Sequence, residues 1–227
     1  MPLELKSYIV AFIDLLGFSA MVAHDCETPN GEQKYIESLY ECHMETKSLK
    51  SDHPDLQLIQ FSDSVVLALP YSVANYVSIV GMISDYQYNL LSKGILCRGG
   101  ISYGKHFFTE DFLFSNGMIE AYRIESRVAN SPRVIVSNDL FELVKPRIID
   151  QRINVPLLFE QDGLWFIDYL HERDAADAWS SISKVIPPEL SDFSSIRSKQ
   201  IWVIDYYNYS FPGHVCVVNN KFTASPP

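Results

Sequence analysis

Short apolar runs alternate with longer amphipathic stretches along this chain, and their order predicts a mixed α and β protein. Residues 8–13 form a β-branched and aromatic run, apolar at nearly every position, which is typical of a central strand covered on both faces. Residues 56–61 and 65–69 flank Ser62-Asp63-Ser64 and predict a tight hairpin. The other predicted elements are helices around 18–24 and 33–49, a helix at 74–91, a strand at 95–104, a helix at 118–128, a strand at 134–137 and a helix at 139–144.

The order of these elements, β-α-α-β-β-α-β-α-β, is that of a ferredoxin-like core, a mostly antiparallel sheet with helices on one face. After about residue 150 the pattern changes to a short hairpin, residues 157–159 and 164–167, followed by helices at 175–185 and 195–208. We therefore predict an α+β fold with a core domain at residues 1–150. Residues 151–227 are predicted to form a C-terminal α/β extension that packs on this core.

Composition narrows the classes of protein that fit. A chain of 227 residues with 47% apolar content can bury a substantial core. Its net charge of -10 argues against a nucleic-acid surface, which needs a basic stripe. The chain shows neither a signal-peptide layout at its start nor an apolar run long enough to span a membrane. The cysteines lack disulfide-framework or metal spacing, so we expect a cytoplasmic protein with reduced thiols; they are Cys26, Cys42, Cys97 and Cys216.

Two acidic residues stand at the ends of apolar strands. Asp14 ends the first strand directly before a turn that contains Gly17, and Asp63 lies at the predicted hairpin turn. Such a pair is costly unless a cation lies between the two side chains, and the usual occupant is a divalent metal with a phosphate chain attached. Taken singly, Asp14 also fits a helix cap and Asp63 a simple turn residue. As a pair they favour nucleotide chemistry.

Four segments in order, within roughly residues 7–137, resemble the class III nucleotide cyclases, and more closely the bacterial pyrimidine cyclases of anti-phage signalling. Each segment alone is a weak signal, but the four together, with compatible spacing, are fairly specific. The segments are Phe12-Ile-Asp14-Leu-Leu-Gly17-Phe-Ser19, Ser62-Asp63, Arg98-Gly-Gly100-Ile-Ser-Tyr-Gly104 and Ala121-Tyr-Arg123-Ile-Glu125.

The resemblance implies a triphosphate site with two divalent cations, Mn²⁺ or Mg²⁺. Asp14 and Asp63 would hold both cations, assisted by the carbonyl of Leu15. Arg98 would bind the triphosphate with its forked donors, although a structural ion pair is the alternative for a guanidinium in an apolar strand. The backbone amides that would face the β- and γ-phosphates are those of the turn Leu16, Gly17, Phe18 and Ser19.

The resemblance also assigns the helix at 118–128 to the reacting phosphate. Arg123 lies where cyclases hold an arginine against the α-phosphate in the transition state. Four residues earlier such cyclases usually carry Asn for the ribose, and here that position is Ile119, for which Glu120 or Arg127 would compensate. Glu125 fits a helix-surface or ion-pair residue better than a catalyst.

Two further departures concern the base. Purine cyclases read it with Lys and Asp at the positions of Ile59 and Phe112, neither of which can hydrogen-bond a purine edge. Gln57 and Gln60 carry donors and acceptors that suit a pyrimidine, with solvent-facing strand positions as the alternative. The predicted reaction is UTP to 3′,5′-cyclic UMP and pyrophosphate. The alternatives are a cytidylate cyclase, a purine cyclase with unusual base contacts, and a cyclase-like regulatory domain without catalysis.

The resemblance implies partners as well. A head-to-tail homodimer would build two composite sites, with the metals on one chain and Arg123 from the other. A separate receptor protein would bind the cyclic nucleotide and damage the infected cell or its membrane. In the extension, Trp202 and Tyr206 are one helical turn apart and predict packing in a core or against a partner subunit. Lys199 is a possible phosphate contact that we do not count among the site residues.

Overall fold

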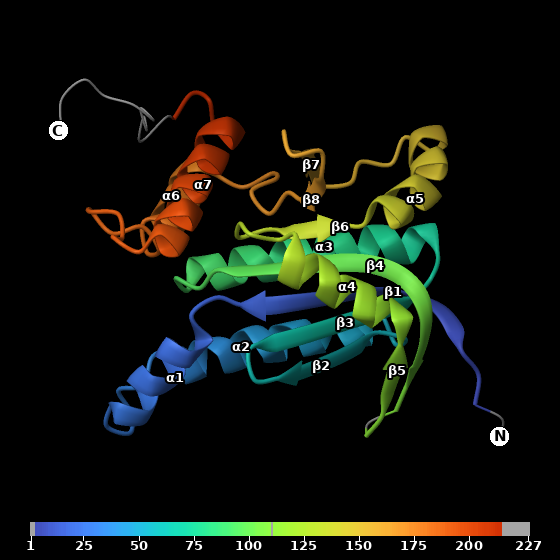
Figure 1. The fold of residues 1–227 in the computed structure, drawn as a ribbon, viewed down its shortest axis with the longest axis horizontal. Helices are drawn as coiled ribbons and strands as arrows, with labels where there is room; N and C mark the ends of the chain where they lie inside the picture. The colour runs from blue at the N-terminus through green and yellow to red at the C-terminus, as the bar shows by residue number, and fades with distance from the viewer. Residues whose placement is uncertain (1–2, 110, 215–227) are drawn as a thin grey trace.

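The computed structural model describes residues 3–109 and 111–214, which build one sheet flanked by helices (Figure 1). The strands follow the spatial order β2-β3-β1-β4-β6-β8-β7, with β5 paired to β4. All pairs are antiparallel except β4 with β6. The strands are β1 (Lys6–Leu15), β2 (Gln57–Phe61), β3 (Ser64–Pro70), β4 (Cys97–Phe108), β5 (Leu113–Ser115), β6 (Val134–Val136), β7 (Leu157–Phe159) and β8 (Trp165–Ile167). The helices are α1 (Phe18–Glu27), α2 (Tyr35–Ser48), α3 (Val73–Ser92), α4 (Asn116–Arg127), α5 (Asn138–Asp150), α6 (Ala175–Ile182), α7 (Ser194–Ser210) and a 3-10 turn, Leu49–Ser51.

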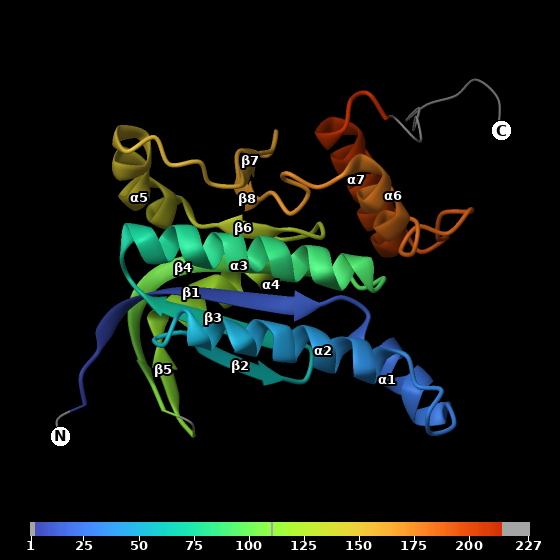
Figure 2. The ribbon, with the colours of Figure 1, turned by 180° about the vertical axis from the view of Figure 1, so that it is seen from behind.

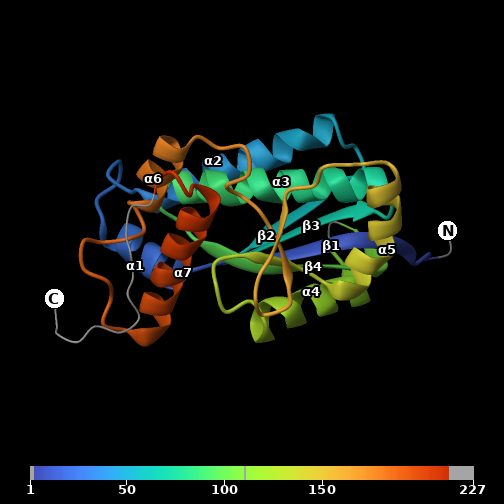
Figure 3. The same cartoon turned by 90° about the horizontal axis from the view of Figure 1, so that it is seen from above.

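The central strand β1 is covered on both faces, as its continuous apolar run predicts. Ile9 and Ile13 belong to the large core under α2 and α3, whereas Val10 and Phe12 pack with Ala121 of α4. Figures 2 and 3 show α2 and α3 on one side of the sheet and α4 on the other. The prediction that the helices lie on one face is therefore wrong. An apolar strand buried on both sides needs a layer over each.

Helix α4 lies directly on β4, and glycines make this approach possible. A Cβ on Gly100 would stand 2.4 Å from the Ala121 carbonyl oxygen and 2.6 Å from the Ile124 Cβ. The Ser102 hydroxyl donates a hydrogen bond of 2.6 Å to the Gly117 carbonyl and fixes the helix along the strand. The prediction of close backbone approach at the glycines of this strand is confirmed.

Strand β4 is longer than its sequence pattern predicts, and β5 was not predicted at all. The chain continues to Phe108, turns back with a 2.9 Å hydrogen bond from the Thr109 amide to the Phe112 carbonyl, and pairs again. Helix α5 also extends further than predicted, through Pro146 to Asp150. Within the described residues no helix combines the length and apolar character that a bilayer crossing requires.

The sheet continues past residue 150, because β8 pairs with β6 and β7 pairs with β8. Helices α6 and α7 build a second core with this hairpin. In that core the Trp202 and Tyr206 rings stack with centroids 5.2 Å apart, which confirms their predicted packing role. The division of the chain at residue 150 remains a prediction. Cys26, Cys42 and Cys97 are free thiols, and Cys216 lies outside the described residues.

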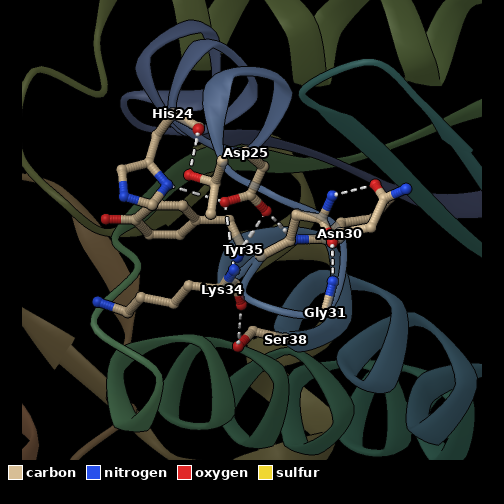
Figure 4. A network of polar contacts seen from close by, with 10 residues as sticks. His24, Asp25, Asn30, Gly31, Lys34, Tyr35 and Ser38 are labelled. Carbon is tan, nitrogen blue, oxygen red and sulfur yellow. Dashed lines mark hydrogen bonds and ion pairs between the residues drawn. The ribbon is translucent and has the colours of Figure 1, made fainter.

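Helix α2 begins without a side-chain cap of its own, and Asp25 of α1 takes that place (Figure 4). The Asp25 carboxylate accepts the amides of Tyr35 at 2.8 Å, Ile36 at 2.7 Å and Lys34 at 3.2 Å, and it contacts the His24 ring. Burial of this carboxylate would raise its pKa, but the hydrogen bonds, led by that of Ile36, lower the pKa to about 2. Asp25 thus joins α1 to the start of α2.

We expect Gly100→Ala to lower the free energy of unfolding by about 3 kcal/mol or more, because the added Cβ meets backbone and not a movable side chain. Gly81→Ala is the matched control, since Gly81 lies within α3 with open space around its Cβ position. That change should stabilise the protein by up to about 1 kcal/mol. Urea denaturation measures the change in the free energy of unfolding for each variant. Equal changes from the two substitutions would contradict the close packing of α4 on β4.

The Asp25 contacts predict a pH-dependent stability difference between wild type and Asp25→Asn. A folded pKa of about 2 lies below the unfolded value of about 3.9, so the contribution is present above pH 4 and is lost as pH falls toward 2. The urea midpoints of the two proteins should therefore converge over that range. Asp192→Asn, which removes an exposed carboxylate, should show no such convergence. A difference that stays constant with pH would refute the role of the Asp25 charge.

Candidate active site

The end of β1 and the β2–β3 turn bring Asp14 and Asp63 together. Asp14 is paired in register with Ser64 of β3 and Arg98 of β4. The Leu15 amide donates a 2.8 Å hydrogen bond to the Asp63 carbonyl, which joins the hairpin turn to the end of β1. The predicted tight hairpin is confirmed. Its two-residue turn places Ser62 in the left-handed region with φ 52.

The turn after β1 leads directly into α1. Gly17 stands before the helix with φ 80, and no side chain caps the helix, so Asp14 does not act as its cap. In the described part of the chain, the amides of Gly17, Phe18 and Ser19 donate to no acceptor. Free amides at a helix N-terminus form a ready site for a phosphate. The Leu16 amide instead donates to the Leu96 carbonyl at 2.8 Å, so the phosphate contact predicted for it is not available.

Arg98 connects the acidic groups of this region. Its Nε lies 3.4 Å from Asp14 Oδ2, and its Nη2 lies 2.6 Å from Glu125 Oε1 of α4. A longer contact of 3.4 Å reaches the Ala129 carbonyl. Glu125 is only 4% exposed, so its carboxylate is a buried partner for this arginine. The ion-pair alternatives for Arg98 and Glu125 are confirmed, and the triphosphate role of Arg98 remains a prediction.

Acidic charge exceeds basic charge at this site. Burial raises the pKa of Asp14, Arg98 opposes that shift, and the nearby Asp63 adds to it. For Glu125, burial again raises the pKa first, Arg98 lowers it, and both Asp14 and Asp63 raise it. Arg98 therefore pairs with two of three neighbouring carboxylates, and the pKa values of Asp14 and Glu125 remain raised. A bound cation would relieve this imbalance.

The donor set fits divalent cations of the Mg²⁺ and Mn²⁺ type, which prefer oxygen ligands. Asp14 and Asp63 supply two carboxylates at one end of the sheet. Among the residues that the structure describes, no group of three or more His, Cys, Asp or Glu side chains is placed to hold a metal ion. The remaining ligands would be backbone carbonyls, water and oxygens of a bound phosphate.

Arg123 is not part of this constellation within one chain. Its side chain is 57% exposed on α4, with Nη1 3.3 Å from Glu120 Oε2, whereas Glu125 of the same helix turns toward Arg98. Ile119 is also exposed on α4. The arginine predicted to meet the α-phosphate is thus presented at the protein surface.

The residues predicted to contact the nucleotide base do not share one surface of the protein. Ile59 packs beside Phe12 on the α4 face of the sheet, and Phe112 is 54% exposed at the β4–β5 turn. Gln57 is occupied, because its Oε1 lies 2.7 Å from His106 Nε2 and its Nε2 contacts the Tyr8 hydroxyl. Adjacent strand positions alternate between faces, so Gln60 does not share a face with Ile59.

Gln60 instead lines a cavity of about 710 Å³ between α1 and α2, which the sequence reading missed. Phe18 and Ser62 reach it from the two turns of the site, so the cavity borders the Asp14–Asp63 region. Apolar side chains from facing turns of two helices form most of its wall, and only the packing of α1 against α2 reveals them. These include Met21, Val22, Tyr35, Ile36, Leu39 and Tyr40.

Comparison with solved structures identifies the fold. The adenylyl cyclase CyaB of P. aeruginosa matches with a TM-score of 0.52 and 13% identity over 74% of this chain and 96% of that chain. A rhodopsin-guanylyl cyclase catalytic core with converted specificity, in complex with ATPαS, also matches with a TM-score of 0.52. Its sequence is 13% identical, and the match covers 72% of this chain and 96% of that chain. A structure of adenylate cyclases from Trypanosoma brucei in their monomeric state matches with a TM-score of 0.51 and 11% identity over 74% of this chain and 92% of that chain. No family model and no curated protein matches the sequence.

At these identities the comparison establishes the fold alone. The chain has the α+β fold of the class III adenylyl and guanylyl cyclase domains, which confirms the predicted fold class. The neighbours do not distinguish one nucleotide base from another for this chain.

Proposed function

We propose that this protein is a pyrimidine nucleotide cyclase that converts UTP into 3′,5′-cyclic UMP and pyrophosphate. The observation that carries the proposal is the Asp14–Asp63 pair, held together by the Leu15–Asp63 hydrogen bond beside three free helix N-terminal amides. Carboxylates for metals next to amides for phosphates are what a metal-dependent reaction of a nucleoside triphosphate requires. The cyclase fold supports the same conclusion.

In this proposal each group has a defined task. Asp14 and Asp63 would hold two divalent cations, assisted by the Leu15 carbonyl, and such cations would lower the pKa of a ribose 3′-hydroxyl and neutralise a triphosphate. The amides at the start of α1 bind phosphate oxygens. The 3′-oxygen then attacks the α-phosphorus in line, the bond to the β-phosphate oxygen breaks, and the hydroxyl proton leaves to solvent.

Arg123 enters the reaction from a second chain. Because its guanidinium is exposed on α4 and pairs with Glu120 rather than with Asp14 or Asp63, a head-to-tail homodimer would bring it to the partner's triphosphate. There it would stabilise charge that grows on the α-phosphoryl oxygens. The same arrangement would place Ile59 and Phe112 at the partner's base.

The choice of a pyrimidine rests on the side chains at those two positions. Ile59 and Phe112 offer no hydrogen bond to a purine edge, so a larger base would leave its polar groups unpaired. Cytosine is the alternative to uracil. The product would act in the cytoplasm as a second messenger in antiviral defence, through a separate effector that binds the cyclic nucleotide.

Two other functions have specific support. A regulatory cyclase-like domain without catalysis is favoured by Ile119 at the ribose position, and the intact Asp14–Asp63 pair argues against it. A purine cyclase with unusual base contacts is favoured by the neighbours, whose names are those of adenylyl and guanylyl cyclases. Incubating the protein with each of the four nucleoside triphosphates distinguishes the pyrimidine cyclase, the purine cyclase and the regulatory domain.

We expect the purified protein with Mn²⁺ to cyclise UTP, and CTP more slowly, while leaving ATP and GTP nearly untouched. Unpaired polar groups on the wrong base can reduce kcat/KM by about 10⁴-fold. Cyclic products of the four triphosphates are measured under one condition, with Asp63→Asn as an isosteric control that should be inactive yet folded. Turnover of ATP equal to that of UTP would refute the pyrimidine assignment, and no cyclic product from any triphosphate would refute the cyclase assignment.

The composite site predicts that two inactive variants restore activity when mixed. Asp14→Ala and Arg123→Ala chains form mixed dimers with one intact site, so random subunit exchange should recover roughly a quarter of wild-type activity. Asp14→Ala mixed with Asp63→Ala is the matched control, and it should recover none, because both changes affect the same half of each site. Recovery in neither mixture, despite demonstrated subunit exchange, would exclude Arg123 from the partner's site.

A further inference from the structure

Helix α7 of the C-terminal segment stands beside the end of the sheet that carries the candidate site. Figures 1 and 3 show α7 at the same end of the molecule as the end of β1 and the start of β4. Leu96, just before β4, packs against the second core, to which Val203 of α7 belongs. The carbonyl of the same Leu96 accepts the Leu16 amide. One residue therefore joins α7 to the turn with the free amides.

Lys199 projects from this side of α7. It precedes the fully buried Val203 by four residues, so the two side chains share a helix face. The orientation of the helix start is also fixed, because the Ser191 amide donates to the buried Gln200 side chain at 2.9 Å. Val203 lies in the second core against which Leu96 packs, and the charge of Arg98 acts on Lys199, so this face of α7 lies on the side of the start of β4.

Lys199 is a half-buried cation without an anionic partner. Its Nζ donates one hydrogen bond of 2.9 Å to the Ser195 carbonyl, which leaves two of its three donors unused. In the described ranges no carboxylate lies within ion-pair distance of Lys199. Burial first, and then the charge of Arg98, lower the pKa of Lys199. Two cations close enough for one to lower the pKa of the other favour an anion bound near both.

We propose that Lys199 is a substrate-binding residue, which contacts the terminal phosphates of the nucleoside triphosphate together with Arg98 and the amides of Gly17, Phe18 and Ser19. The inference rests on the proposed function and adds the C-terminal segment to its site. An ammonium group is a compact charge that suits phosphate oxygens, and Lys199 would break no ion pair to reach them. The segment after residue 150 is then part of the binding machinery.

The test measures binding of inorganic tripolyphosphate in the presence of Mn²⁺ by calorimetry, with no turnover and no base. Lys199→Ala should weaken binding about tenfold or more, as expected for the loss of a charge-assisted hydrogen bond. Arg197→Ala is the matched control. It removes the same charge from an exposed position of the same helix, and it should change the dissociation constant by less than about twofold.

The possible outcomes separate this inference from the proposed function. Equal weakening by the two substitutions indicates long-range charge only and overturns the assignment of Lys199, as does unchanged binding by Lys199→Ala. Failure of the wild-type protein to bind tripolyphosphate overturns the proposed triphosphate site and the inference with it. Lys199→Gln removes the charge but keeps a hydrogen-bond donor of similar reach for the Ser195 carbonyl, so it tests the charge even where Lys199→Ala folds poorly. It should weaken tripolyphosphate binding as much as Lys199→Ala does.

Discussion

The hydrogen bond from the Leu15 amide to the Asp63 carbonyl is the constraint on which the candidate site depends. It holds a hairpin turn against the end of the central strand, and so it keeps two carboxylates together that would otherwise repel. The core on both faces of β1 makes that position rigid. Arg98 offsets part of the repulsion, but Glu125 shares the same guanidinium and leaves the site acidic. A bound cation would relieve the remaining imbalance of charge.

The local parts of this arrangement follow from the sequence, because their physical causes are local. The unbroken apolar run of β1 indicates burial on two faces, and two apolar runs around Ser62-Asp63-Ser64 indicate a tight hairpin, whose turn is in fact only Ser62 and Asp63. The glycines of β4 indicate that another backbone approaches closely, although not which one. The assignment of helices to one face was wrong because periodicity shows which face of an element is buried without showing what covers it.

The parts that sequence reasoning missed are contacts between residues far apart in the chain. For Glu125 the sequence suggests an ion pair without its partner, which is found only when α4 lies on β4 and brings Glu125 to Arg98. For Lys199 the sequence suggests a phosphate contact, but only the second core shows that α7 lies beside the start of the same strand. The Leu16 amide fits a phosphate-binding turn until the Leu96 carbonyl is found to accept it. None of these depends on residue type or spacing alone, so only the three-dimensional packing reveals them.

The pairing of β6 with β8 has a consequence for how the protein is made. A chain leaves the ribosome N-terminal end first, so β1 to β6 are available for folding before β8 exists. During that interval β6 is the outer strand of the nascent sheet, and an unpaired edge is a template for association with other chains. Strand β6 is only three residues long, Val134–Val136, and so exposes few free backbone groups. The brevity of β6 limits aggregation before synthesis is finished.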